Sequence, residues 1–380
     1  MKRNYGIDLL RSIAMIMIPI LHVLGQGGIL KAVTPLSMNY EAAWLLEIAC
    51  YCAVNCFALI SGYVGISTNF KHYRGLVLWL QVLFYTVFIT LLFHLFMPST
   101  TNAKVWLNAF TPATSYQYWY FSAYFALFLF IPFINIALNA LTLSQMKRLG
   151  ITIFVLLSIW QTVCSVDFLS LKNGYTFLWL LSLYILGAVI KKTEFGIHRT
   201  NGTLFLIYTA CILITWGLKY FLELQPSSFI KPNLLVQYNS VTITVASISL
   251  LLLCSKLNFK SSIAKGLISF FSPLSFSVYL IHVHPLIWKN LFLGRFVKLA
   301  KLNTLYFVLA VLLSALGIYV VSSLIDYVRL QLFRLLHVTK LCKSLVAPLD
   351  TLYNGAGHLP PVIEMPTNVE ENEAAYKTAN

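Results

Sequence analysis

The sequence has little charge and very few acidic residues. Charged residues make up 10% of its 380 positions, and 12 Asp or Glu stand against 27 Lys or Arg. Soluble domains carry roughly 25% charged residues. Hydrophobic residues reach 59% and the mean hydropathy is +0.78, which is more apolar surface than a soluble fold of this length can bury. The composition therefore excludes soluble globular, disordered and coiled-coil proteins, and it predicts an integral membrane protein.

Motifs for metal ligands and for secretion are also missing. The seven cysteines include no C-x-x-C pair, and we interpret them as buried thiols. His282 and His284 are two residues apart, about 200° on a helix, so they cannot both ligate one metal ion unless the helix unwinds. The first apolar run has no small-x-small cleavage site and is long enough to span a bilayer. We therefore expect a retained helix, not a signal peptide, and no metal site.

Long apolar runs recur along most of the chain and are continuous, as in transmembrane helices, not alternating as in β-barrel strands. We predict an all-α, polytopic membrane protein with about ten transmembrane helices. The predicted runs are 8–27, 43–63, 75–97, 119–141, 150–166, 175–190, 203–222, 236–255, 267–288 and 304–326.

The basic residues are scattered singly between these runs, which indicates membrane topology and not nucleic-acid binding. An orientation with both termini in the cytoplasm places most Lys and Arg residues on the cytoplasmic side of the cell membrane. The C-terminal tail contributes Arg329, Arg334, Lys340, Lys343 and Lys377 to this side.

Residues 289–303 do not follow the positive-inside rule, by which Lys and Arg residues gather on the cytoplasmic side of a membrane protein. They carry Lys289, Arg295, Lys298 and Lys301, and the predicted topology assigns them to the outer side. Either these cations bind an anionic group there, or the ninth run is misplaced.

No loop is long enough for a second folded domain. We divide the chain into a transmembrane domain, 1–340, and a cytoplasmic, largely disordered tail, 341–380. The stretch from Leu359 to Asn380 is acidic, polar and proline-containing, as is typical of disordered segments.

The first run contains three ionisable residues, Asp8, Arg11 and His22. Such residues are costly in hydrocarbon and therefore predict function. A local ion pair with Asp8 or an extension to the headgroups also explains Arg11. His22 follows Arg11 by eleven residues, so both share one helix face, about 16 Å apart along the axis. His22 is either a hydrogen-bonded packing residue or a catalytic imidazole.

Two further stretches have both a structural and a functional interpretation. Lys71 and Arg74 point the same way on a helical turn, either as ordinary topological charges or as an anion clamp beside Arg11. The aromatic stretch 116–124 is either a belt at the membrane interface or the wall of a sugar-binding mouth.

At these residues the sequence resembles the membrane acyltransferase-3 family. GIDLLRSIAMIMIPILH, with Arg11 and His22, is similar to the family's R-x10-H signature. FALISGY at 57–63 resembles its second-helix motif. Lys71-His72-Tyr73-Arg74 is similar to its R-x-x-R motif, with Lys in the first place, which keeps the charge but loses the bidentate fork of Arg.

Two later stretches extend the resemblance, which covers roughly residues 5 to 330. Trp119-Tyr120, followed by Tyr124 and Pro132, resembles the family's W-[YF]…Y…P stretch, and the YLIH sequence that ends at His282 is similar to its late motif.

The resemblance implies an integral membrane enzyme that moves an acyl group, usually acetyl, from cytoplasmic acyl-CoA to a hydroxyl of a carbohydrate or lipid-linked sugar of the cell envelope. Acyl-CoA is then a co-substrate, and no bound cofactor is implied. The implied partners are this donor, the carbohydrate acceptor, membrane lipids and, because no extracellular hydrolase-like domain is fused here, a separate extracytoplasmic protein.

The resemblance also implies three sets of site residues. The catalytic set is His22, Arg11 and Asp8. The donor-binding set is Arg11, Lys71, Arg74 and Ser61, and the acceptor-binding set is Trp119, Tyr120, Tyr124, Tyr279 and His282.

A transporter or flippase of a lipid-linked sugar is the main alternative, because it too would place polar residues inside a helical membrane domain. The lack of detectable internal repeats counts against it. The residues leave open whether His22 acts as a general base or accepts the acyl group covalently.

Overall fold

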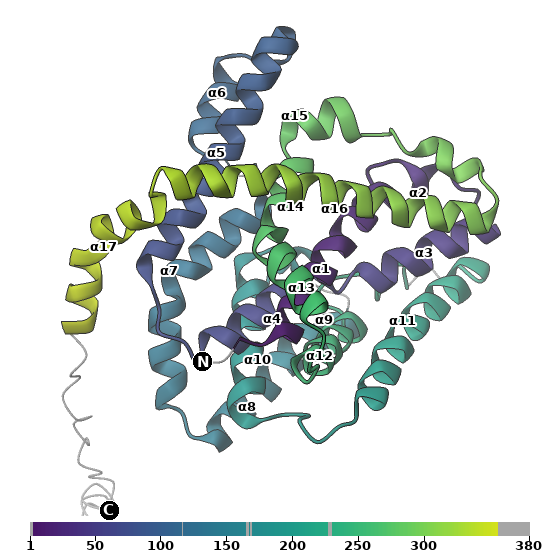
Figure 1. Cartoon of the computed structure of the whole chain (residues 1–380). Coiled ribbons are helices and arrows are strands. Elements are labelled where there is room, and N and C mark those ends of the chain that lie inside the picture. Colours follow the sequence, from purple (N-terminus) through teal and green to yellow (C-terminus); the bar gives the residue numbers. More distant parts are fainter. Residues whose placement is uncertain (1–2, 116, 165–166, 168, 227–229, 356–380) are drawn as a thin grey trace, which may run out of the picture.

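The computed structural model describes residues 3–355 apart from 116, 165–166, 168 and 227–229, and every regular element in this part is a helix (Figure 1). The longer helices are α1 (Tyr5–Leu24), α3 (Met38–Cys50), α4 (Ala53–Gly65), α5 (His72–Phe96), α7 (Trp119–Ala140), α8 (Leu143–Phe154), α10 (Phe177–Thr193), α11 (Asn201–Leu224), α12 (Val241–Ser255), α13 (Ser262–Phe271), α14 (Ser275–His282), α16 (Thr304–Leu335) and α17 (Val338–Gly355). The short elements are α2 (Ile29–Ala32), η1 (Pro98–Thr100), α6 (Ala103–Phe110), η2 (Val155–Ile159), α9 (Trp160–Cys164), η3 (Lys172–Gly174), η4 (Ser272–Leu274), α15 (Pro285–Ile287), η5 (Trp288–Phe292) and η6 (Val297–Lys301).

Eight helical segments of the described chain are long and apolar enough to cross a membrane. They fall on eight of the ten predicted runs, which confirms the all-α, polytopic class. The other two predicted runs, 175–190 and 236–255, coincide with α10 and α12, which are 17 and 15 residues long. The total of ten spans stays a prediction. The spanning segments are Tyr5–Ala32, Met38–Gly65, His72–Phe96, Trp119–Ala140, Leu143–Cys164, Asn201–Leu224, Ser262–His282 and Thr304–Leu335.

Helix α1 lies in the middle of the molecule, where it packs against α3, α4, α12, α13, α14 and α16 (Figure 1). Its residues Leu10, Ala14 and Leu24 are fully buried. The helix begins at a strong N-cap, because the side chain of Asn4 accepts hydrogen bonds from the first free backbone N–H groups. A central position makes α1 the scaffold on which polar side chains can be held away from lipid.

The outward helix faces carry large apolar side chains. Phe133, Leu313 and Val328 are each more than 60% exposed. Contiguous apolar surface of this kind is unfavourable in water and suits contact with lipid tails. The surface thus agrees with the multi-pass membrane protein that the composition predicts.

Helices α4 and α10 approach each other through glycines. A Cβ atom at Gly62 would lie 1.8 Å from the carbonyl oxygen of Tyr184, and one at Gly187 would lie 2.1 Å from that of Leu59. Small residues permit this close backbone contact, which is typical of helix pairs in membranes. The packing fixes α4 and therefore Ser61, which precedes Gly62.

The ninth predicted run, 267–288, is broken in the structure. Its helical part ends at His282, because His284 caps the short helix α15, which begins with Pro285. The chain from Pro285 to Lys301 then folds back over the end of α1. Two backbone hydrogen bonds hold it there, from the N–H of Gly294 to the carbonyl of Gln26 and from the N–H of Phe296 to that of Gly27, both 3.0 Å long.

The C-terminal part of the described chain is helical as far as residue 355. Helix α16 is 32 residues long and continues past 326, so Arg329 is a buried helical residue and not a tail cation. Helix α17 includes residues 341–355 of the predicted tail. The stretch from Leu359 to Asn380 lies outside the described residues, and the boundary at 340 stays a prediction.

Candidate active site

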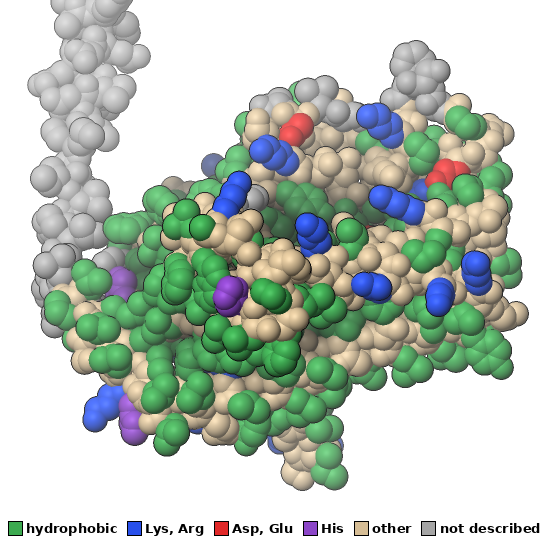
Figure 2. Space-filling model, turned by 90° about the horizontal axis from the view of Figure 1, so that it is seen from above, with side chains coloured by type: hydrophobic (Ala, Val, Ile, Leu, Met, Phe, Trp, Pro, Cys, Tyr) green, Lys and Arg blue, Asp and Glu red, His purple; other side chains and the backbone are tan. Residues whose placement is uncertain are grey.

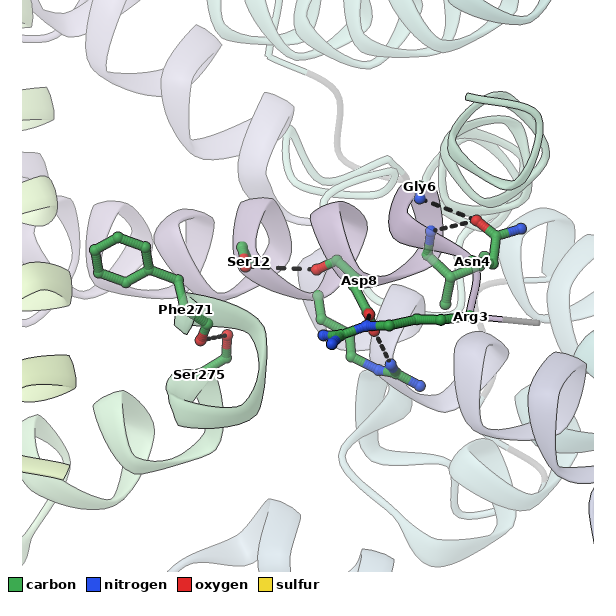
Figure 3. A network of polar contacts seen from close by, with 9 residues as sticks. Arg3, Asn4, Gly6, Asp8, Ser12, Phe271 and Ser275 are labelled. Atoms are coloured by element: carbon green, nitrogen blue, oxygen red, sulfur yellow. Dashed lines mark hydrogen bonds and ion pairs between the residues drawn. The ribbon is translucent and has the colours of Figure 1, made fainter. Parts of the chain in front are cut away.

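The first turns of α1 hold the carboxylate of Asp8 between two arginines (Figure 3). Asp8 Oδ2 accepts from Arg3 Nε and Asp8 Oδ1 from Arg11 Nη1, each over 2.6 Å. Asp8 is 7% exposed, whereas the side chain of Arg11 remains 34% exposed. The three groups leave one net positive charge at this end of α1, with part of the Arg11 guanidinium open to a ligand.

The predicted ion pair of Asp8 and Arg11 is therefore present, but a third residue takes part in it. Arg3 bonds the second carboxylate oxygen, so Asp8 is fully used in orienting the two arginines. Both carboxylate oxygens are thus occupied by guanidinium groups. The geometry favours a positioning role for Asp8 over direct proton transfer.

His22 lies near the other end of α1 and contacts His282 of α14. The distance from His22 Nδ1 to His282 Nε2 is 2.8 Å, although 260 residues separate the two in sequence. The second ring nitrogen of His282, Nδ1, is hydrogen-bonded to the backbone carbonyl oxygen of Val278. We call His22 and His282 the histidine pair.

This hydrogen-bond chain determines the tautomer of both neutral rings. The carbonyl of Val278 can only accept, so His282 Nδ1 carries the proton and His282 Nε2 has the free lone pair. That lone pair accepts from His22 Nδ1–H, which leaves the lone pair of His22 on Nε2. His22 Nε2 is thereby available as a base or a nucleophile.

The surroundings of the histidine pair combine burial with access. His282 is only 3% exposed, whereas His22 is half-buried. The indole ring of Trp288 stands perpendicular to the His22 ring at a centroid distance of 5.0 Å, and the ring of Phe292 stacks on that of Trp288. The folded-back segment 285–301 therefore forms one wall beside His22.

A second wall is aromatic and joins α14 to α7 and α4. The rings of Tyr279 and Tyr120 lie 6.4 Å apart, and those of Tyr120 and Tyr124 are stacked at 5.9 Å. The hydroxyl groups of Tyr124 and Ser61 are 3.2 Å apart. Since Tyr279 is one turn before His282, these side chains form a continuous row from Ser61 to the histidine pair.

Most of the predicted acceptor-binding residues thus come together, and Trp119 lies at their edge. Its ring contacts Tyr120 at 5.6 Å and also Tyr175 and Tyr238, at 4.8 and 6.3 Å. Ser61 lies at the end of the same row of side chains, although the family resemblance implies that it binds the donor. Its hydroxyl also donates to the carbonyl of Phe57.

The predicted cation clamp is not assembled in the structure. Lys71 is the N-cap of α5 and Arg74 lies in its first turn, and both are exposed. Among the described residues, no hydrogen bond or ion pair joins either of them to Arg11. Their role in donor binding stays a prediction.

The sequence interpretation missed Trp288 and Tyr118. The hydroxyl of Tyr118 donates to the carbonyl of Leu280, 2.8 Å away, and so anchors the turn that carries His282. Trp288 follows His282 by six residues, and its position three residues after Pro285 was the available signal. Tyr118 belongs to the aromatic stretch 116–124, which the interpretation considered only as a belt or a sugar-binding wall.

A separate cavity of about 910 Å³ lies between α8, α10, α11 and α12. Its wall is almost entirely apolar, with Lys147, His198 and Arg199 among its lining residues. None of the lining residues belongs to the histidine pair or the aromatic row. This cavity is therefore distinct from the candidate active site.

Comparison with known proteins agrees with the resemblance seen in the sequence. The sequence model of the acyltransferase-3 family, described as an acyltransferase domain, matches residues 4–323, which include the residues of the site other than Arg3. No curated protein and no solved structure matches the chain. The match covers most of the chain and favours an enzyme over a transporter. The chain belongs to the acyltransferase-3 family and is a membrane acyltransferase that transfers groups other than amino-acyl groups.

Proposed function

We propose that this protein transfers an acyl group, with acetyl the expected one, from cytoplasmic acyl-CoA to a hydroxyl of a cell-envelope carbohydrate or lipid-linked sugar. The proposal places it in the cell membrane with both termini in the cytoplasm, as the distribution of Lys and Arg predicts. The donor then enters at the end of α1 that carries Arg11, and the acceptor reaches the end that carries His22.

One observation carries the proposal, namely the hydrogen-bond chain from Val278 through His282 to His22. It leaves the lone pair of His22 on Nε2, with His282 as the orienting partner. An imidazole held in one tautomer by a second group is the arrangement that activates hydroxyl nucleophiles in acyl transfer.

In the proposed reaction, His22 Nε2 takes the proton of the acceptor hydroxyl while the oxygen attacks the thioester carbonyl carbon. The C–S bond of the donor then breaks, an ester forms, and the CoA thiolate takes the proton back from His22. A covalent variant, in which Nε2 itself attacks and the acceptor hydroxyl then displaces the imidazole, uses the same geometry.

The length of α1 suits the shape of the donor. Eleven residues separate Arg11 from His22, which corresponds to about 16 Å along the helix axis. The long flexible arm of CoA can bridge this distance with its phosphates near Arg11, Lys71 and Arg74, since arginine and lysine form strong charge-assisted hydrogen bonds to phosphate. Uncompensated positive charge at the Arg11 end supports this direction of entry.

The direct test replaces His22 by Ala. We expect His22→Ala to abolish transfer from labelled acetyl-CoA to membrane glycans, and also hydrolysis of acetyl-CoA, while the protein reaches the membrane at the normal level. His94→Ala is the matched control, because His94 is exposed at the end of α5. Near-normal activity of the His22 variant would show that His22 is a packing residue and would overturn the proposal.

A further inference from the structure

The segment that folds over the end of α1 is strongly basic. It carries Lys289, Arg295, Lys298 and Lys301, and Lys31 lies on α2 beside it; we call these five residues the basic rim. All five are exposed, and none forms an ion pair with a described residue. No Asp or Glu occurs from Gly25 to Tyr40 or from Val283 to Asn303. The rim is therefore uncompensated positive charge.

Figure 2 looks down on the face that carries α6 and α15 in Figure 1. On this face Lys and Arg side chains surround a hollow, and Asp and Glu side chains are sparse. Hydrophobic side chains are visible inside the hollow. A concave surface with cations at its edge concentrates anions from solution.

The basic rim is connected directly to the candidate active site. Lys289 follows Trp288, whose ring contacts His22, and the hydrogen bonds of Gly294 and Phe296 fix the segment on the loop after α1. The side chain of Asn39 donates to the carbonyls of Ala300 and Leu302, which fixes the other end of the rim on α3. The cations are thus held beside the approach to His22 and are not on a free loop.

The donor does not need these cations. Arg3, Arg11, Lys71 and Arg74 belong to the opposite end of the helices, about 16 Å from His22 on α1, where the CoA phosphates are proposed to bind. We infer that the basic rim binds an anionic group, a carboxylate or a phosphate, of the carbohydrate acceptor and so holds the acceptor hydroxyl at His22 Nε2. This inference rests on the proposed function. It narrows the class of proposed acceptors to carbohydrates that carry an anionic group.

The inference also explains why residues 289–303 carry four cations although the predicted topology assigns them to the outer side of the membrane. Cations on the translocated side of a membrane protein oppose its insertion, so they are retained where they have a function. Lys and Arg recognise phosphate and carboxylate by charge-assisted hydrogen bonds, which are strongest near apolar surface. The half-buried Trp288 and buried Phe292 supply such a surface next to Lys289.

The test compares two triple variants of the full chain in phosphatidylcholine nanodiscs. The rim variant is Lys289→Gln, Lys298→Gln and Lys301→Gln; Arg295 is retained because its guanidinium donates to the carbonyl of Asn290. The matched control removes three exposed cations elsewhere, with Lys104→Gln, Lys172→Gln and Lys231→Gln.

Three probes distinguish the sources of the anionic group: tetragalacturonate, its uncharged methyl ester, and citronellyl diphosphate. We expect Kd for at least one anionic probe to rise about tenfold in the rim variant and to stay within about twofold in the control. The methyl ester should bind all three proteins alike. A preference for tetragalacturonate indicates an acidic glycan, and a preference for the diphosphate indicates a lipid-linked sugar. Equal affinities in the two variants would overturn the inference.

The KM for acetyl-CoA in the hydrolysis reaction provides the second readout. It should be unchanged in the rim variant, because hydrolysis needs the donor and water only. A rise in this KM would mean that the rim holds the donor, and the inference would be wrong. If wild-type protein neither hydrolyses acetyl-CoA nor transfers its acetyl group to membrane glycans, the proposed function fails, whereas the probe affinities still decide on the rim.

Discussion

One ring nitrogen of His282 controls the chemistry available to His22. The bond from His282 Nδ1 to the carbonyl of Val278 leaves only Nε2 to face His22, and so fixes where the lone pair of His22 lies. Catalytic imidazoles that lose such a partner adopt the wrong tautomer or orientation.

We predict that His282→Ala lowers kcat by about 10²–10⁴-fold, since proton transfer by a positioned imidazole contributes about that much. The KM for acyl-CoA should change little, because His282 lies away from the predicted phosphate site. Steady-state kinetics on purified protein measure both quantities. His94→Ala is the control, since it removes an exposed imidazole at the end of α5, away from the pair. A similar loss in both variants would reduce His282 to a packing residue.

A second buried polar group stabilises the fold without taking part in the site. The carboxylate of Asp326 is fully buried and accepts from Arg329 at 2.7 and 2.9 Å and from the hydroxyl of Tyr85 at 2.7 Å. These bonds join α16 to α5. Among the described residues, neither Asp326 nor Arg329 contacts the histidine pair.

We predict that Asp326→Ala destabilises the protein by about 3–5 kcal/mol, because it leaves the buried guanidinium of Arg329 unpaired. The double variant Asp326→Ala, Arg329→Met should recover much of this loss, since it removes the unpaired charge as well. Thermal unfolding in detergent, followed by fluorescence-detected size exclusion, compares the two variants. Equal melting temperatures for the single and double variants would contradict the explanation.

At the scale of elements, the start of α5 presents Lys71 and Arg74 to the solvent. Lys343 of α17 lies over the ring of Tyr73, 5.1 Å from its centroid, so α17 adds a further cation to this surface. Exposed cations contribute little to stability but can bind a polyanion such as CoA.

We predict that Lys71→Gln with Arg74→Gln raises the KM for acyl-CoA by about tenfold and lowers kcat much less, as expected when binding is lost equally from the ground and transition states. Initial rates across acyl-CoA concentrations give both constants. Lys147→Gln with Arg148→Gln is the control, because these exposed cations lie at the start of α8. Unchanged KM in the first variant would make Lys71 and Arg74 topological charges only.

Helix positions could be predicted from sequence better than helix ends. Continuous apolar runs locate the helices, but α16 continues past the predicted end because Asp326 and Arg329 neutralise each other inside it. Helical periodicity alone also predicts that Arg11 and His22 share one face of a helix. The contact of His22 with His282 did not, because nothing in local spacing relates residues on two helices that are far apart in sequence.

The whole molecule has different chemistry at the two ends of α1. Arg3, Asp8 and Arg11 form an ionic group at one end, and the histidine pair with the basic rim lies at the other. A donor that cannot cross a membrane and an acceptor from the far side would meet along this helix.

We predict that a cysteine at Thr114 reacts with a membrane-impermeant maleimide in intact cells, whereas one at Ser144 does not. Both positions are exposed, and they lie at opposite ends of α7. Of the seven native cysteines, Cys164 is exposed and six are buried, so Cys164→Ser is the essential background substitution. Permeabilised cells provide the control, since both positions should then react. The reverse pattern in intact cells would invert the orientation.

The distance in sequence between His22 and His282 has a consequence for biosynthesis. Chains are made from the N-terminus, so α1 is among the first helices to enter the membrane and α14 is among the last. His22 therefore cannot contact His282 until about 260 further residues have been synthesised. The segment that covers it, tied to Gln26 and Gly27, arrives later still. An incomplete chain thus carries His22 without the ring that orients it, so under the proposed mechanism activity appears only when insertion is nearly finished.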